Sequence, residues 1–284
     1  IGEPTSGRET EDPDWYEPTI HPQRVLVIGG GPAGLETARV ATMRGHTVTL
    51  RERTDRLGGL AGVTGPNIPI VDWLIGEVGR LGVAVELETP VDADHDPAVG
   101  RDVDVDVDVV VQCTGSTAGR REYDLDDDVA SMVHDVADVR RGLVELPGDG
   151  TVVLLDPIGG PIAVSLAEEL GERAVLVTHD QIAGNELART GDLTPANTRL
   201  QQRGVTIERR TIPRAVRRAD TPGVEAGTTV EVELEDRFTG ERRTIAAASS
   251  LPSAAPSCWR RRSTCLPSAA WPGAPTPRSP TPSP

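Results

Sequence analysis

Short apolar runs alternate with amphipathic segments along most of the chain. The apolar run Val25 to Ile28 predicts a buried strand, and the Ala- and Leu-containing segment after it predicts a helix that ends near Gly45. A second run, Thr47 to Arg51, predicts the next strand. Between the first strand and the helix stands the sequence Gly29-Gly30-Gly31-Pro32-Ala33-Gly34. The pattern therefore predicts a strand–turn–helix–strand unit whose first turn is rich in glycine.

The spacing of these glycines is typical of a turn that binds a dinucleotide. Gly29 permits a tight turn, Gly31 lets a pyrophosphate approach the backbone, and Gly34 lets the helix pack against the strand. The helix N-terminus offers free N–H groups to phosphate. Glu52, which follows the second strand, can accept hydrogen bonds from ribose hydroxyls. A glycine-rich turn that binds nothing is the alternative, but spacing, flanking elements and acid together favour a nucleotide site comprising Gly29, Gly31, Pro32, Ala33, Gly34 and Glu52.

Further elements extend this unit into a sheet. Helical spacing of apolar residues predicts a helix over Ile70 to Leu81, and a strand follows over Val83 to Leu87. Main-chain groups of Thr89 to Val91 could meet an adenine edge. The apolar run Val109 to Val111 predicts a core strand that ends in Cys113-Thr114-Gly115-Ser116. This second glycine turn lies where ligands bind in open α/β sheets, at the carboxyl ends of parallel strands.

A second βαβ unit follows. Thr151 to Leu155 and Ala174 to Thr178 predict parallel strands, with a helix over Ile162 to Leu170 between them. The turn Asp156-Pro157-Ile158-Gly159-Gly160-Pro161 lacks the GxGxxG spacing. It therefore leaves two alternatives open, a working dinucleotide site on Asp156, Gly159 and Gly160 or a vestigial one. Downstream, Thr229 to Leu234 and Arg243 to Ile245 predict an antiparallel hairpin.

The predicted organisation is α/β, with two Rossmann-like nucleotide-binding domains. The last 38 residues contain nine prolines and eight serines but no acid, which indicates a disordered tail or a shifted reading frame. The predicted segments are an extended lead-in over 1–23, a first nucleotide-binding domain over 24–146, a second one over 147–246, and the tail over 247–284.

Composition narrows the possible partners. The formal net charge of −15 argues against nucleic acid and anionic membrane surfaces as partners. With no membrane-length apolar run and no signal peptide, we expect a soluble, cytoplasmic protein whose partners are nucleotide cofactors. The three cysteines make neither a disulfide framework nor a complete metal site, and the five histidines are scattered, so no metal site is predicted.

The order of motifs resembles a known flavoenzyme family. The motifs are VLVIGGGPAGLETARVATMRGHTVTLRERTDRLGG, VVVQCTGS, VVLLDPIGGPIAVSLAEEL and GDLTPANTRLQQRGV. They resemble the C-terminal half of the 2,4-dienoyl-CoA reductase and trimethylamine dehydrogenase group of NADH:flavin oxidoreductases. The resemblance covers about residues 1 to 246 and implies two nucleotide-binding domains of glutathione-reductase type. It also implies that a TIM barrel with FMN and a 4Fe–4S cluster lies upstream of this chain.

The resemblance assigns further residues to the first nucleotide, which would be FAD or ADP. It places the adenosine beside Arg53, the pyrophosphate near Gly59 and Leu60, and the adenine near Val91, with Thr114 and Gly115 matching the family's Ala-Thr-Gly turn. From the residues alone, Gly58-Gly59 is equally well explained as a simple loop. Cys113 stands where the family has Ala, and we interpret it as a small buried hydrophobe because no resolving thiol or positive charge is evident.

The resemblance also predicts the function. NAD(P)H would reduce FAD, and electrons would pass to the cluster and FMN of the barrel; no catalytic side chain is assigned to this chain. The family's return strand to the first domain is missing, which predicts an incomplete FAD domain. Two alternatives stand beside this hypothesis: a non-catalytic module that holds ADP as a structural nucleotide, and an inactive gene fragment.

Overall fold

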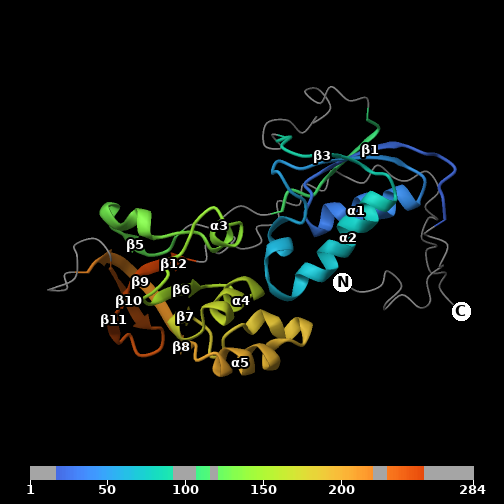
Figure 1. The fold of residues 1–284 in the computed structure, drawn as a ribbon. Helices are drawn as coiled ribbons and strands as arrows, with labels where there is room; N and C mark the ends of the chain where they lie inside the picture. The colour runs from blue at the N-terminus through green and yellow to red at the C-terminus, as the bar shows by residue number, and fades with distance from the viewer. Residues whose placement is uncertain (1–16, 92–106, 116–120, 220–228, 253–284) are drawn as a thin grey trace, which may run out of the picture.

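The computed structural model describes residues 17–91, 107–115, 121–219 and 229–252 (Figure 1). Its first sheet consists of β1 (Arg24–Ile28), β2 (Thr47–Arg51), β3 (Ala84–Glu86) and β4 (Val109–Gln112). All neighbours are parallel, in the order β3-β2-β1-β4. The predicted lead-in up to residue 16 and most of the predicted tail, with Cys258 and Cys265, lie outside the described residues.

Two helices cover one face of the first sheet. Helices α1 (Pro32–Met43) and α2 (Ile68–Arg80) pack together there, and Val25 and Val27 of β1 point into the cluster between helices and sheet. The intervening Leu26 points to the other face, as the alternation of a strand requires. Two 3₁₀ segments, η2 (Gly59–Val63) and η3 (Gly65–Asn67), connect β2 to α2. The helices contribute the buried side chains Leu35, Ala38, Val71, Leu74 and Val78.

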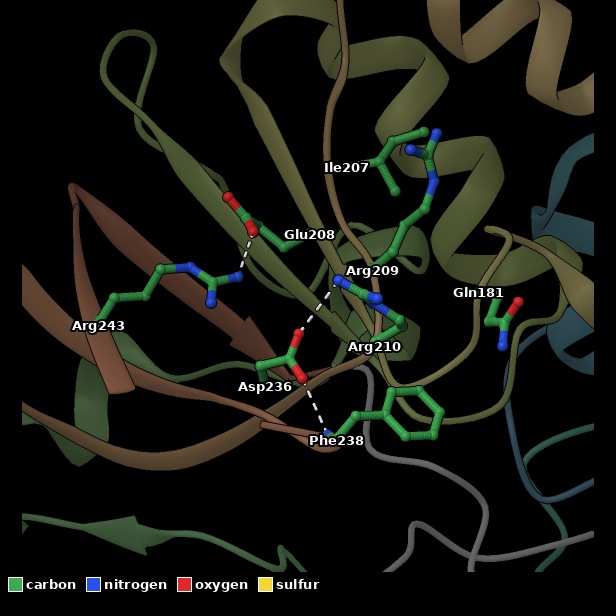
Figure 2. A pocket seen from close by; sticks show the side chains of 8 residues that line it. All are labelled: Gln181, Ile207, Glu208, Arg209, Arg210, Asp236, Phe238 and Arg243. Carbon is green, nitrogen blue, oxygen red and sulfur yellow. Dashed lines mark hydrogen bonds and ion pairs between the residues drawn. The ribbon is translucent and has the colours of Figure 1, made fainter. Parts of the chain in front are cut away.

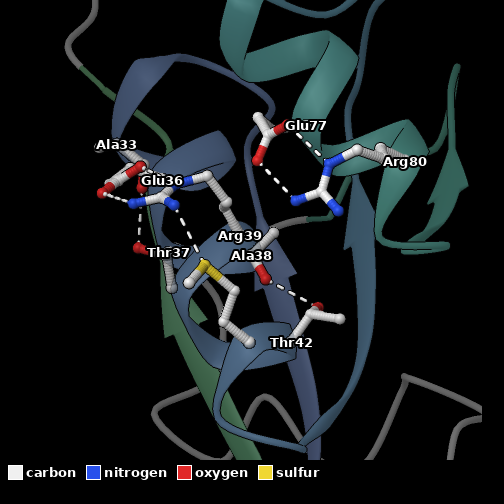
Figure 3. A network of polar contacts seen from close by, with 9 residues as sticks. Ala33, Glu36, Thr37, Ala38, Arg39, Thr42, Glu77 and Arg80 are labelled. Atoms are coloured by element: carbon white, nitrogen blue, oxygen red, sulfur yellow. Dashed lines mark hydrogen bonds and ion pairs between the residues drawn. The ribbon is translucent and has the colours of Figure 1, made fainter. Parts of the chain in front are cut away.

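Polar side chains of α1 and α2 form ion pairs within each helix (Figure 3). Arg39 donates to Glu36 at 2.7 Å, and its guanidinium lies 5.4 Å from the centroid of the Trp73 ring on α2. Arg80 donates to Glu77 at 2.8 Å, and this bond lowers the pKa of the Glu77 carboxyl. Surface ion pairs of this kind contribute little to stability, because water screens the charges. The Arg39–Trp73 contact joins the two helices, and the buried cluster supplies most of the stability.

The second sheet repeats the arrangement of the first. It consists of β6 (Val152–Asp156), β7 (Ala174–Thr178), β8 (Thr206–Glu208) and β12 (Ser249–Pro252). The strands are parallel, in the order β12-β6-β7-β8. Helices α4 (Pro161–Leu170) and α5 (Leu193–Gln202) bury Val164 and Leu200 against one face, together with Leu154 of β6.

A third, mostly antiparallel sheet covers the other face of the second. It consists of β9 (Thr211–Arg218), β10 (Val230–Asp236), β11 (Arg242–Ala247) and β5 (Asp124–Leu125). β10 and β11 form the predicted hairpin. Every second residue of β10 is buried, and Val232 and Leu234 pack against Val153 and Val177 of the second sheet. The second unit is thus a three-layer arrangement of helices, parallel sheet and mixed sheet.

Two parts of the chain lie elsewhere than the sequence predicts. The segment that follows β4 already packs with the second unit, since Val129 and Val136 lie in its two buried clusters. It comprises β5, η4 (Asp127–Met132) and α3 (Val136–Arg140). The predicted tail begins within β11, and its first residues form β12, which pairs with β6. The division into two domains at residue 146 stays a prediction, but these elements favour an earlier crossover.

Candidate dinucleotide sites

At the first glycine turn, neighbouring backbone leaves no room for a side chain on Gly29 or Gly34. Gly29 has φ +104°, and a Cβ on it would lie 2.4 Å from the carbonyl oxygen of Cys113. A Cβ on Gly34 would lie 1.8 Å from the carbonyl oxygen of Gly29. Neither position can carry a side chain without moving the backbone of the turn. The two outer glycines therefore bring β1, α1 and the end of β4 together as the sequence predicts.

The middle glycine of the motif faces open space. A Cβ on Gly31 would meet no atom of the described residues within 4 Å, and Gly31 is the N-cap of α1 with extended backbone (φ −74°). The first N–H bond of the helix runs from Leu35 to the Gly31 carbonyl at 2.9 Å. The N–H groups of Ala33 and Gly34 precede that bond, and Pro32 has none. The helix N-terminus thus presents donors and positive dipole to the space above Gly31, as an anion site requires.

Glu52 is buried beside this turn rather than free at its rim. Only 8% of the residue is exposed, and its Oε2 accepts a hydrogen bond from the Gly30 N–H at 2.7 Å. Its Oε1 accepts from the N–H and the hydroxyl of Thr54, each at 2.9 Å. A carboxylate oxygen can accept two hydrogen bonds, so Oε2 keeps one acceptor site. Glu52 therefore stabilises the turn and still has an acceptor available for a ribose hydroxyl.

The loop after β2 lies directly against the turn. The Gly58 N–H donates to the Gly30 carbonyl at 2.8 Å, and a Cβ on Gly59 would lie 3.3 Å from the Gly31 Cα. Leu60, the next residue, is half-buried in η2. The structure therefore brings this loop to the predicted pyrophosphate position. Contact with a nucleotide stays a prediction.

The remaining residues predicted for the first nucleotide are spread around this centre. Arg53 is exposed immediately after Glu52, and Val91 packs against the far face of the sheet beside Leu26. Thr114 and Gly115 follow β4 and are exposed. The ligand contacts of these residues stay predictions.

Cys113 has the environment of a structural residue. It is partly buried in the apolar cluster of the first unit, and its Sγ lies 3.8 Å from the Thr37 hydroxyl. Burial raises the pKa of the Cys113 thiol, and the Thr37 contact only partly opposes this effect. The reactive form of cysteine is the thiolate, which burial disfavours. This environment supports the interpretation of Cys113 as a small hydrophobe.

The second glycine turn is more crowded than the first. Gly159 has φ +73°, and a Cβ there would lie 3.0 Å from the Asn185 N atom. Gly160 is the N-cap of α4, but a Cβ on it would lie 3.6 Å from the Ile158 side chain. The turn presents a helix N-terminus, as in the first unit. The space above it is partly filled by the protein itself.

Asp156 places a buried carboxyl under the second turn. It is 3% exposed, and its Oδ1 accepts from the N–H groups of Gly159 (2.9 Å) and Ile158 (3.2 Å). Its Oδ2 is buried and has no hydrogen-bond partner among the described residues. Burial raises the pKa of Asp156 to about 6, although the two N–H bonds act in the opposite direction. The carboxyl is therefore mainly ionised at neutral pH, and its charge opposes a pyrophosphate at this turn.

A pocket that the sequence analysis missed lies at the carboxyl ends of the strands of the second sheet (Figure 2). Its volume is about 710 Å³. The lining residues come from the β7–α5 loop, the β8–β9 turn and the β10–β11 hairpin: Gln181, Ile207, Glu208, Arg209, Arg210, Asp236, Phe238 and Arg243. The sequence signal for it is the pair Arg209-Arg210, which directly follows β8.

Neither a metal-binding cluster nor a membrane-spanning helix is found among the described residues. Within the described ranges, no group of three or more His, Cys, Asp or Glu side chains is arranged to hold a metal ion. Among the helices of the described residues, none has the length and apolar character needed to cross a bilayer.

Comparison with known protein families and curated proteins shows that this chain is similar to oxidoreductases. Residues 3–141 match the pyridine nucleotide-disulphide oxidoreductase family. An NADH oxidase from Thermoanaerobacter brockii is 31% identical over 181 residues, which are 62% of this chain and 26% of that protein. An N,N-dimethylglycine/sarcosine dehydrogenase from Chromohalobacter salexigens is 34% identical over 184 residues, 58% of this chain and 24% of that protein. The chain thus spans about a quarter of the length of these relatives.

Solved structures of other proteins have the same fold as this chain. Histamine dehydrogenase from Rhizobium sp. 4-9 superimposes with a TM-score of 0.69 and 25% identity, over 89% of this chain and 37% of that one. Lactococcus lactis thioredoxin reductase gives a TM-score of 0.56 at 16% identity, over 81% and 76% of the two chains, and shows the fold alone. The predicted fold class and the family resemblance are confirmed.

Proposed function

Because residues 3–141 carry a pyridine nucleotide-disulphide oxidoreductase domain, we propose that this chain is an FAD-dependent NAD(P)H oxidoreductase module. The observation that supports this most directly is the first glycine turn. Gly29 and Gly34 are sterically required, whereas Gly31 faces open space at the N-terminus of α1. A turn built only for tight packing would need no such opening. The opening has the position and the donors that a pyrophosphate needs.

The residues of the first unit fit FAD or ADP. The N–H groups of Ala33 and Gly34 would hold the pyrophosphate, and Glu52 would orient the ribose through its remaining acceptor site. When bound, FAD supplies the redox chemistry, and the protein supplies binding and orientation. No side chain of this chain is assigned a proton-transfer or nucleophilic role.

The second unit would bind NAD(P)H. Its turn over Asp156 to Gly160 ends at the N-terminus of α4, which supports a dinucleotide there. Electrons would then pass to an FMN and 4Fe–4S barrel in the remainder of a longer protein. The limited share of each relative that the chain covers is compatible with such a barrel.

One observation favours a second candidate, a non-catalytic module that holds ADP in the first unit only. The buried Asp156 carboxylate and the Ile158 side chain make the second turn a poorer anion site than the first. Under this alternative the second unit keeps the fold of a dinucleotide domain without turnover. The first unit would retain its nucleotide as a structural element.

The visible absorbance of the purified chain distinguishes these functions. The oxidoreductase proposal predicts a yellow protein whose flavin band is bleached by NADH or NADPH without air. A colourless protein that releases ADP on denaturation would support the structural module and contradict the proposal. A colourless protein without nucleotide, even after incubation with FAD, would contradict both and leave the inactive fragment.

A further inference from the structure

The pocket of the second unit carries an unbalanced positive charge in a strongly acidic protein. Three arginines and two carboxylates line it. Arg210 pairs with Asp236 at 3.3 Å, and Arg243 pairs with Glu208. Arg209 is exposed and makes no ion pair within the part of the chain that the structure describes. The Arg209 guanidinium is therefore available to an anionic ligand.

The turn that carries the two arginines is held in place by its surroundings. Arg210 has φ +57°, a left-handed conformation that costs free energy in a residue other than glycine. Its N–H donates to the Asp180 carbonyl at 2.9 Å, and its carbonyl accepts from the Arg237 N–H at 2.8 Å. The Thr211 hydroxyl donates to the Arg209 carbonyl at 2.8 Å. These bonds hold the backbone of the turn at the edge of the pocket, from which Arg209 extends toward Ile207 and Arg210 toward Asp236 (Figure 2).

An exposed aromatic ring completes the pocket. Phe238 is 63% exposed at the tip of the β10–β11 hairpin, and it is the one phenylalanine of the sequence. The guanidinium of Arg210 lies 6.0 Å and that of Arg237 lies 5.5 Å from its ring centroid. Figure 2 shows Phe238 beside Arg210 at the edge of the pocket. A flat ring next to guanidinium groups suits a ligand that combines a planar base with a phosphate.

The pocket adjoins the second glycine turn. The Asp180 carboxylate oxygen lies 3.4 Å from the position of a Cβ on Gly159, and the Asp180 carbonyl binds the turn of Arg210. A dinucleotide whose pyrophosphate lies at the N-terminus of α4 would therefore have its adenosine end at this pocket.

The two units differ at the residue that would meet the adenosine ribose. In the first unit β2 ends at Arg51 opposite Ile28, and Glu52 follows. In the second unit β7 ends at Thr178 opposite Asp156, and His179 follows. An acid at this position binds a free 2′-hydroxyl and repels a 2′-phosphate. The neighbouring acid is Asp180, whose Oδ1 lies 3.4 Å from the His179 Nε2.

From this geometry we propose that the pocket binds the 2′-phosphorylated adenosine end of NADPH, with Arg209 and Arg210 holding the phosphate and Phe238 lying against the adenine. The inference rests on the proposed function of the second unit, because it needs a dinucleotide at that turn. It deepens that function by selecting NADPH over NADH. No covalent step is involved.

Calorimetric titration of the full chain with NADPH and with NADH tests the proposal. NADPH should bind at least about tenfold more tightly than NADH, because charged hydrogen bonds to the 2′-phosphate are lost in NADH. The variants Arg209→Gln and Arg210→Gln should each reduce this ratio by about tenfold. Arg218→Gln is the matched control, since Arg218 is an exposed arginine of β9 paired with Asp128 at 2.6 Å. Its ratio should equal that of the unmodified chain.

Each other result contradicts the inference in a recognisable way. Equal affinities, or tighter binding of NADH, would overturn it while leaving NAD(P)H binding intact. An unchanged ratio in both pocket variants would overturn the roles of Arg209 and Arg210. Failure of both dinucleotides to bind would overturn it together with the second half of the proposed function. A chain without flavin that still prefers NADPH would contradict only the proposed flavin site.

Discussion

At the scale of single residues, substitution by alanine should have different effects at Gly31 and at Gly34. Gly31→Ala should fold with nearly unchanged stability, because its backbone is extended and its Cβ would meet no atom within 4 Å in the part of the chain that the structure describes. The new methyl would occupy the space of the pyrophosphate, so bound nucleotide should be lost. Gly34→Ala should destabilise the fold, because its Cβ would lie 1.8 Å from the Gly29 carbonyl oxygen.

Thermal unfolding and the nucleotide content of denatured protein measure these two effects separately. The expected result is that Gly31→Ala is stable but contains no nucleotide, whereas Gly34→Ala is less stable than the unmodified chain. Retention of nucleotide by Gly31→Ala at the level of the unmodified chain would contradict the placement of the pyrophosphate.

Asp156 gives a residue-scale prediction about pH. Its pKa is about 6 in the folded chain and 3.8 as the ordinary value, so the folded state binds more protons between these values. Stability should therefore fall as pH rises from about 4 to about 6, by roughly 3 kcal/mol for this group, and should then stay level. Asp156→Asn cannot ionise. It should be more stable than the unmodified chain at pH 7 and lose this advantage near pH 4.

Chemical unfolding from pH 4 to pH 8 measures both curves. The matched control is Asp149→Asn, which removes an exposed acid in the loop before β6. Parallel curves for Asp156→Asn and the unmodified chain would show that this carboxyl titrates normally.

At the scale of elements, the periodic segments could be predicted and the short ones could not. β1, α1 and β2 follow from an apolar run, a helical pattern and a glycine turn that agree with one another. β5 has two residues and no period, so its pairing with β9 leaves no trace in the sequence. β12 joins β6 through backbone pairing, which a proline- and serine-rich composition conceals.

The candidate sites divide in the same way. The first glycine turn is contiguous, so spacing alone identifies Gly29, Gly31 and Gly34. The pocket of the second unit combines a strand end, a turn and a hairpin tip, and only the fold brings Arg209, Arg210 and Phe238 together. The burial of Glu52 could not be predicted from the sequence either, because it depends on the loop that contributes Thr54.

At the scale of the whole molecule, the two units have separate buried clusters. Leu35 belongs to the cluster of α1, α2 and the first sheet, whereas Leu154 belongs to that of α4, α5 and the second sheet. The units also contact each other, since a Cβ on Gly65 of η3 would lie 3.0 Å from the Ser165 side chain of α4, and Arg56 donates to the Arg141 carbonyl at 2.7 Å. Units that each have their own buried core tend to unfold independently.

We therefore expect two unfolding transitions that respond to different substitutions. Leu35→Ala and Leu154→Ala each remove a fully buried side chain and should each cost about 2–5 kcal/mol. Leu35→Ala should lower one transition and Leu154→Ala the other, and added ADP should raise only the transition that Leu35→Ala lowers, because it binds the folded first unit. Differential scanning calorimetry resolves the assignment. A single transition shifted equally by both variants would mean that the units fold cooperatively, so that a nucleotide bound in one would stabilise the other as well.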